Sequence, residues 1–270
     1  MKSRQVPYSI FAEVKLRLLN TKKIKNFEGS EIPVIISLTS IPFRLNRLHL
    51  VIKSLLLQTS KPKKIILWLD NSLQNKIPTN LTKLYGDIFS IEFTSLNSSH
   101  VKLVPTLEKY PNEIIVTCDD DLVYDKDWLK DLYEEHLQYP QDIVAYTVRQ
   151  IQFDENNNLL PYNQWKIKDL SKSSTLLALG YNGILYPPNT LPKETLNSEL
   201  YMKLAPKADD LWFKAMALLN NTTIRKVRKI PKENIPIMAT QKVSLKKQNI
   251  GKLKNNQQWE ALVEHFNLKL

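Results

Sequence analysis

The chain has 270 residues, of which 43% are hydrophobic, enough for one large α/β domain or a domain with a small appendage. No run approaches the eighteen or more apolar residues of a membrane span, and residues 1–20 lack the continuous apolar core of a signal peptide, so we expect a cytoplasmic protein. The single cysteine, Cys118, excludes a disulfide framework and a multi-cysteine zinc site.

The formal net charge of +11 is concentrated near the two ends of the chain. Seven Lys and Arg residues stand against Glu13 in the first 25 residues, and ten stand against Glu233 in residues 221–254. Such basic regions can attract nucleic acid, anionic lipid headgroups or a phosphorylated small molecule, or they can simply be solvated. Near the N-terminus, four apolar residues gather on one side of a possible helix, namely Ile10, Phe11, Val14 and Leu18. This pattern predicts peripheral contact with an anionic membrane at its cytoplasmic face.

Strands and helices are predicted to alternate through the first half of the chain. Residues 31–41, 63–71, 89–96 and 112–121 have the apolar character of strands, while residues 44–59 and 101–110 have helical spacing or composition. Such alternation favours a doubly wound, mostly parallel sheet whose ligands bind at the carboxyl ends of its strands. Asp70 and the run Asp119, Asp120 and Asp121 are both expected at those ends.

The second half is less regular. Residues 126–140 and 207–221 predict helices, and residues 142–148 predict a strand. Residues 174–188 read as paired strands around Gly180 and Gly183, and residues 256–268 as a short amphipathic helix. We expect a basic extension over residues 1–30, a catalytic domain over 31–220, and a basic segment over 221–270 that packs on the same domain.

The three consecutive aspartates are the most informative feature of the sequence. Like charges repel, and a buried charge without its partner costs about 3–5 kcal/mol, so something positive should lie between them. At period two, Asp119 and Asp121 would lie on one side of the strand and Asp120 on the other. Carboxylate oxygens in that arrangement suit Mg²⁺ or Mn²⁺, which often complete their coordination with phosphates. The alternative is a set of turn and capping aspartates before the next helix.

The segments 34–45, 65–71, 101–124, 180–188 and 208–218, in this order, resemble the bacterial glycosyltransferases of the GT-A fold that are related to family 2 and occur in capsule and lipopolysaccharide biosynthesis. The resemblance covers roughly residues 31–260, and its most specific block is residues 102–121. It implies the Rossmann-like fold of nucleotide-diphospho-sugar transferases. It also implies transfer of a hexosyl or N-acetylhexosaminyl group from a nucleotide sugar, often a UDP-sugar, to a glycan or lipid-linked hydroxyl.

The resemblance also implies roles for individual residues. Asp119 and Asp121 would hold a Mn²⁺ or Mg²⁺ ion against the donor diphosphate, and Asp120 would contact ribose or sugar hydroxyls. The implied donor-binding residues further include Thr39, Ser40, Arg44, Asp70, Lys102 and Gly183. The plain alternatives are that Thr39 and Ser40 cap the following helix, that Asp70 begins a turn, and that Arg44 is solvated.

A second carboxylate pair, Asp209 and Asp210, begins the helix predicted over 207–221. Acids at a helix N-terminus can simply complement the helix dipole. In inverting members of the resembled group, an acid at this place is the general base, and we expect that role for Asp210, with Asp209 as the alternative. Trp212 could stack on a sugar ring or lie in the core, and Gly180 and Gly183 could line the sugar pocket or form an ordinary turn.

The sequence is also compatible with two other functions. A nucleotidyltransferase or phosphotransferase could use the same acidic metal site, although the glycine-rich phosphate loop common in such enzymes is missing. A nucleic-acid-binding protein would account for the positive charge, but no recognition motif is present, and we expect no nucleic-acid partner.

Overall fold

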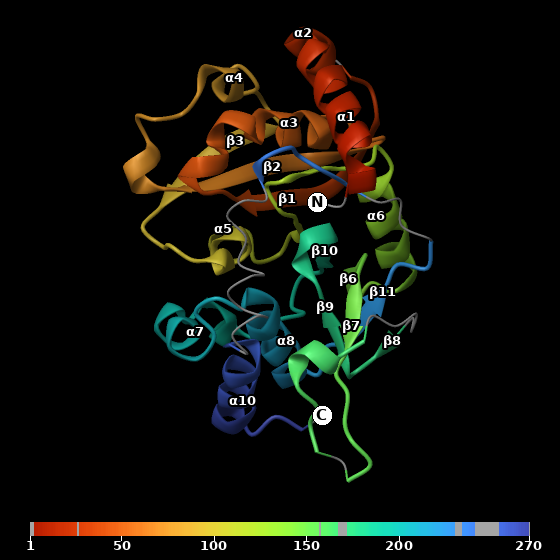
Figure 1. The fold of residues 1–270 in the computed structure, drawn as a ribbon, viewed down its shortest axis with the longest axis vertical. Coiled ribbons are helices and arrows are strands. Elements are labelled where there is room, and N and C mark those ends of the chain that lie inside the picture. The colour runs from red at the N-terminus through yellow and green to blue at the C-terminus, as the bar shows by residue number, and fades with distance from the viewer. Residues whose placement is uncertain are drawn as a thin grey trace.

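An eight-stranded sheet organises the chain. The computed structural model describes residues 3–25, 27–156, 158–166, 172–229, 234–240 and 254–269. The strand order is β3-β2-β1-β4-β10-β6-β11-β8 (Figure 1). In chain order these strands are β1 (Ser30–Thr39), β2 (Ser60–Asp70), β3 (Phe89–Thr94), β4 (Ile114–Thr117), β6 (Ile143–Ala145), β8 (Lys172–Ser173), β10 (Ile184–Tyr186) and β11 (Ile224–Lys226).

The first four strands of this order are parallel. β1 lies between β2 and β4, with Ile36 opposite Ile65 on one side and Val116 on the other, and β2 pairs in parallel with β3. Because parallel strands end at the same edge, Thr39, Asp70 and the residues that follow Thr117 lie along one edge of the sheet. The predicted doubly wound, mostly parallel α/β fold is confirmed.

The other half of the sheet differs from the sequence prediction. β10 pairs antiparallel with both β4 and β6, and the predicted pairing of strands within residues 174–188 is wrong. Instead, β9 (Leu176–Ala178) pairs with β7 (Val148–Gln150) in a separate sheet. A 3-10 helix at Gly180–Asn182 and the positive φ of Gly183 separate β9 from β10. β11 lies beyond residue 220, where the sequence predicts no strand. Its three residues are too few to show an alternating pattern.

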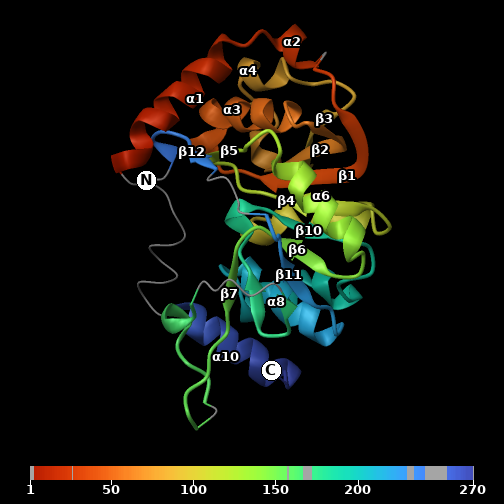
Figure 2. The ribbon, with the colours of Figure 1, turned by 90° about the vertical axis from the view of Figure 1, so that its right-hand side faces the viewer.

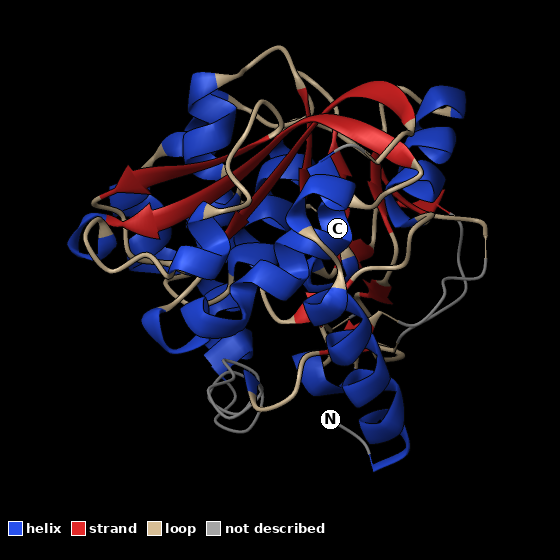
Figure 3. Ribbon diagram, turned by 90° about the horizontal axis from the view of Figure 1, so that it is seen from above, coloured by secondary structure: helices blue, strands red, loops and turns tan. Residues whose placement is uncertain are grey.

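Helices cover both faces of the sheet (Figure 3). One apolar core contains residues of α1 (Val6–Leu18), α2 (Thr21–Lys25), α3 (Leu45–Leu56), α4 (Thr79–Thr82) and α6 (Trp128–Gln138). A second core contains residues of α5 (Val104–Lys109), α7 (Ser198–Leu204), α8 (Asp209–Leu219) and α10 (Lys254–Phe266). Neighbouring residues of β4 alternate between them, with Val116 in the first core and Ile115 in the second. Burial on both faces explains the nearly unbroken apolar runs of the central strands.

A two-stranded sheet joins the N-terminal helix to the aspartate run. β5 (Leu122–Val123) pairs antiparallel with β12 (Ile235–Pro236), and the N–H of Ile237 donates to the carbonyl of Asp121 at 2.9 Å. The Ser9 hydroxyl of α1 donates to the carbonyl of Pro236 at 2.7 Å. Part of the basic segment, including Lys232, Lys242, Lys246, Lys247 and Lys252, lies outside the described residues. The division at residues 30 and 220 stays a prediction.

Candidate active site

The aspartate run lies in the loop that leaves β4 rather than within the strand. Its backbone is fixed by Tyr124, whose hydroxyl accepts a hydrogen bond from the N–H of Asp119 at 2.8 Å and donates one to the carbonyl of the same residue at 3.0 Å. β4 ends at Thr117 and β5 begins at Leu122, so the alternation of a strand does not govern the three side chains.

Arg44 pairs with two of the three aspartates. Its guanidinium contacts the Asp120 carboxylate, and its Nη2 lies 3.0 Å from Asp121 Oδ2. The Ser40 hydroxyl donates to the other carboxylate oxygen of Asp120. Burial raises the pKa of Asp120, although Arg44 and Ser40 both favour its ionised form. Asp121 therefore shares Arg44 with Asp120, and joint metal binding by Asp119 and Asp121 stays a prediction.

Asp119 pairs instead with Lys102, which bridges the two acidic groups of the sequence. Lys102 ends the 3-10 helix Ser99–Lys102, and its Nζ lies 2.9 Å from Asp119 Oδ1 and 3.1 Å from Asp209 Oδ2. The side chain is buried, which disfavours its charge, yet Asp119, Asp209 and Asp210 together raise its pKa well above the ordinary value. Lys102 thus stays charged and holds the aspartate run against the start of α8.

The two acids at the start of α8 have opposite protonation behaviour. Burial opposes ionisation of Asp209, but the charge of Lys102 prevails and lowers its pKa. Burial and the neighbouring charge of Asp209 raise the pKa of Asp210 to about 8. Asp210 Oδ1 also accepts a hydrogen bond from the N–H of Gly180 at 3.1 Å. One acid of the pair is therefore a structural anion, while the other can exchange a proton near neutral pH.

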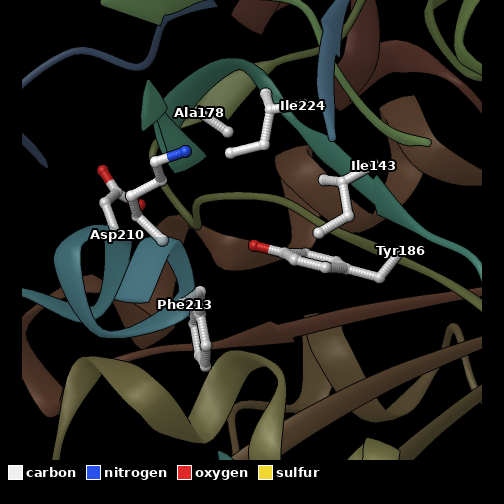
Figure 4. A pocket seen from close by; sticks show the side chains of 7 residues that line it. Ile143, Ala178, Tyr186, Asp210, Phe213 and Ile224 are labelled. Atoms are coloured by element: carbon white, nitrogen blue, oxygen red, sulfur yellow. The ribbon is translucent and has the colours of Figure 1, made fainter. Parts of the chain in front are cut away.

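A small cavity lies beside Asp210 (Figure 4). It has room for about one water molecule, and its lining residues are Ile143, Ala178, Tyr186, Asp210, Phe213, Lys214 and Ile224. The Tyr186 hydroxyl points toward the side of the cavity where Asp210 lies. Sequence reasoning missed both Tyr186, in an apolar strand, and Lys214, although Lys214 lies one helical turn after Asp210. Lys214 is buried, which lowers its pKa to about 7, and its Nζ donates to the carbonyl of Ser174 at 2.5 Å.

Three predicted residues have local structural roles. The Thr39 hydroxyl donates to the carbonyl of Trp68 at 3.0 Å, and Asp70 accepts from the N–H of Ser72 at 2.9 Å, which caps a 3-10 helix. Trp212 is fully buried, and its Nε1 donates to the carbonyl of Thr195 at 3.2 Å, so it belongs to the core rather than to a sugar-stacking surface. Donor contacts by Thr39 and Asp70 stay predictions.

The two glycines near the site are required for different reasons. A Cβ atom at Gly180 would lie 2.9 Å from Asp210 Oδ1 and 3.0 Å from Lys102 Nζ, so its bare backbone lets the acid and the lysine approach. Gly183 has a φ of 107°, and a Cβ there would lie 2.5 Å from a ring carbon of Trp128. Gly180 therefore contacts the acidic cluster, whereas Gly183, the glycine predicted to bind the donor, packs against Trp128.

Replacement of Gly183 by alanine is expected to destabilise the protein by on the order of 3 kcal/mol, because it adds a methyl group against a buried ring and strains the backbone. Thermal unfolding of Gly183→Ala measures this cost. In the background of Trp128→Phe, whose ring is smaller, the same substitution should cost less. An equal cost in both backgrounds would show that the ring contact is not its cause.

The acidic cluster gathers carboxylate oxygens, which are the ligands that Mg²⁺ and Mn²⁺ prefer in proteins. Within the described parts of the chain, no group of three or more His, Cys, Asp or Glu residues could hold a metal ion by itself. The cluster contains two cationic side chains, Arg44 and Lys102. It contains five carboxylates, those of Asp119, Asp120, Asp121, Asp209 and Asp210. Asp119 is the most accessible of the run, with 31% of its side chain exposed. Its oxygens therefore fit a hard cation that takes further ligands from a diphosphate.

In open, mostly parallel α/β sheets, ligands bind outside the carboxyl ends of the strands, and the charged cluster lies at those ends. The chain matches the family "Glycosyl transferase family 2" over residues 43–192 and belongs to this family. It is thus a glycosyltransferase of the GT-A type, as the resemblance in its sequence implied.

No curated protein sequence matches the chain. Among solved structures, it is similar to the 4-diphosphocytidyl-2C-methyl-D-erythritol synthase of Anaerococcus prevotii DSM 20548, with 13% identity and a TM-score of 0.49. That similarity covers 79% of this chain and 95% of the other.

Proposed function

We propose that the protein transfers a sugar from a nucleotide-diphosphate sugar, with UDP-sugars the first donors to test, to a hydroxyl of a glycan or lipid-linked acceptor in surface polysaccharide synthesis. The observation that supports this proposal most is the Lys102 bridge. It holds Asp119, the accessible acid of the run, and Asp209, the neighbour of the candidate base, within 3.1 Å of one ammonium group. The donor diphosphate and the acceptor hydroxyl would then meet at one edge of the sheet.

Asp210 is the general base in this proposal. It takes the proton of the acceptor hydroxyl, whose oxygen attacks the anomeric carbon while the bond from that carbon to the diphosphate breaks. The nucleoside diphosphate leaves with the electron pair, and the configuration at the anomeric carbon inverts. A carboxylate with a pKa of about 8 suits this role, because a base is most effective when its pKa is near the working pH.

Asp119 and Asp121 are the proposed ligands for Mn²⁺ or Mg²⁺. When bound, such an ion would neutralise charge on the departing diphosphate. Asp121 lies 3.0 Å from Arg44, so this guanidinium is placed to share the phosphate charge, while Ser40 fixes the neighbouring Asp120. We further propose donor contacts for Thr39, Ser40, Arg44, Asp70, Lys102, Asp120 and Gly183.

The direct test is donor hydrolysis by the purified protein across a panel of nucleotide sugars, with Mn²⁺, Mg²⁺ or a chelator. One donor should release its nucleoside diphosphate only with a divalent ion. Asp119→Asn should lower that rate by about a hundredfold or more. Replacement of a residue that only supports a metal ligand already lowers activity about tenfold to a hundredfold. The matched control is Asp87→Asn, which removes an exposed acid outside the cluster and should leave the rate unchanged.

The outcomes separate the candidate functions. Consumption of a nucleoside triphosphate with release of pyrophosphate would favour the nucleotidyltransferase alternative. Equal rates for Asp119→Asn and the wild type would remove Asp119 from the donor site. If no nucleotide sugar binds or turns over with either metal, the proposal fails.

A further inference from the structure

The N-terminal helix α1 exposes an apolar stripe. The exposed fractions are 50% for Ile10, 71% for Phe11, 50% for Val14 and 81% for Leu18. At 100° per residue these four side chains lie within an arc of about 100°. Figure 2 shows α1 along the outer edge of the molecule. A contiguous exposed stripe of this kind marks an interaction surface more often than a scatter of single apolar residues does.

The orientation of α1 is fixed, so this stripe cannot turn inward. The opposite side of the helix is buried through Ser9, Ala12, Glu13 and Leu16. The Glu13 carboxylate accepts hydrogen bonds from the N–H of Met238 at 2.6 Å and from Arg47 at 3.2 Å. The Lys53 ammonium donates to the carbonyl of Leu16 at 2.7 Å. The helix is therefore held by its buried face, and the apolar residues opposite that face are left for another partner.

Basic side chains border the stripe on both sides. On a helical wheel Lys15 lies just beyond Phe11, and Arg17 lies just beyond Ile10. Both are exposed, and Arg17 also contacts Glu13 at 3.1 Å. The next helix, α2, adds two exposed cations, Lys22 and Lys23. Apolar residues flanked by Lys and Arg are the pattern of a helix that lies in the plane of a membrane interface.

We propose that α1 docks this protein on an anionic lipid surface. The stripe inserts between the headgroups, while Lys15 and the α2 lysines pair with lipid phosphates. Two other occupants fit less well. A second copy of the helix would bring like charges together along both borders of the stripe, and a nucleic acid backbone would leave the four apolar side chains without a partner. Among the described helices, none is long and apolar enough to span a membrane.

Vesicle flotation with the full chain tests this inference independently of any enzymatic activity. The protein should float with vesicles of phosphatidylcholine and phosphatidylglycerol but not with phosphatidylcholine alone, and high salt should weaken the binding. Phe11→Ser should weaken it at least about tenfold, and Lys15→Gln about fivefold. The matched controls are Leu137→Ser on α6, where the leucine is 60% exposed, and Lys83→Gln, an exposed lysine away from α1.

Three results would overturn the proposal. The first is equal recovery with anionic and neutral vesicles, and the second is unchanged flotation of Phe11→Ser when its thermal melt shows a folded protein. The third is a dimer in sedimentation that Phe11→Ser dissociates, because it would assign the stripe to a second copy of the chain. Since flotation requires no donor, failure of the proposed sugar transfer would leave this result intact.

Discussion

Replacement of Asp210 by asparagine is expected to abolish sugar transfer and, at the same time, to make the protein more resistant to heat. The loss of activity should be about 10²–10⁴-fold, the usual contribution of a general base. The stabilisation follows from the raised pKa of about 8, because asparagine resembles the protonated acid that this site favours. A folded, more stable and inactive variant would separate loss of catalysis from loss of structure.

The pH dependence of this stability effect follows from the sign of the shift. The ordinary pKa of an aspartate is 3.8, and burial with the charge of Asp209 raises that of Asp210 to about 8. The stability that Asp210 contributes is therefore fully present below pH 3.8 and is lost as the pH rises to 8. The melting temperature of Asp210→Asn should exceed that of the wild type by an amount that grows over this interval and then levels off.

Asp209→Asn is the matched comparison for this experiment. The pKa of Asp209 is lowered by Lys102, which lies 3.1 Å away, so its removal should lower the melting temperature at neutral pH. Opposite signs for the two asparagine variants are the expected result. If Asp209→Asn lost more activity than Asp210→Asn while both stayed folded, the base would be Asp209.

Replacement of Lys102 by methionine is expected to have the largest effect on stability. Methionine fills a similar volume but leaves Asp119, Asp209 and Asp210 without their shared cation. Removing one partner of a buried ion pair costs about 3–5 kcal/mol. This corresponds to a fall in melting temperature on the order of 10 °C for a chain of this size.

Lys63→Met is the control, because Lys63 contacts Glu113 at 2.6 Å on the exposed surface. Such a pair contributes at most about 1 kcal/mol. Equal melting temperatures for Lys102→Met and Lys63→Met would contradict this prediction, because they would show that the acidic cluster loses its lysine at no extra cost in the free energy of unfolding. Adding Asp209→Asn to Lys102→Met should restore part of the stability, since it removes one of the stranded charges.

The sequence predicted the parallel half of the fold because its strands are buried on both faces. Val34, Ile35 and Ile36 of β1 have no more than 1% of their surface exposed, and such strands give long apolar runs that are easy to recognise. The antiparallel half has strands of only two or three residues, too short for periodicity to mark their partners. The pairing of β9 and β10 with different sheets depends on the turn at Gly183, which composition alone does not reveal.

The sequence predicted which residues lie near the candidate site better than it predicted which side chains pair with one another. The strand-end rule placed the aspartate run at the carboxyl edge of the sheet, and the structure brings Lys102, Arg44 and Asp209 to it. The partners of each carboxylate depended on side chains distant in sequence. Period two grouped Asp119 with Asp121, whereas the loop after Thr117 allows Asp121 to share Arg44 with Asp120. Tyr186 is part of an apolar strand, and nothing in its sequence neighbourhood distinguishes it.

The short segment that contains β12 connects features that lie far apart in the chain. It accepts a hydrogen bond from Ser9 at Pro236, donates one to Glu13 from Met238, and accepts one from Arg44 at Thr240. Ile237 of the same segment donates to the carbonyl of Asp121. The N-terminal helix thus acts as a brace for the arginine and the loop that carry the site. A shortened protein that begins at β1 would lose this brace. Removal of the first 29 residues would therefore affect the support of the candidate site as well as the proposed membrane contact.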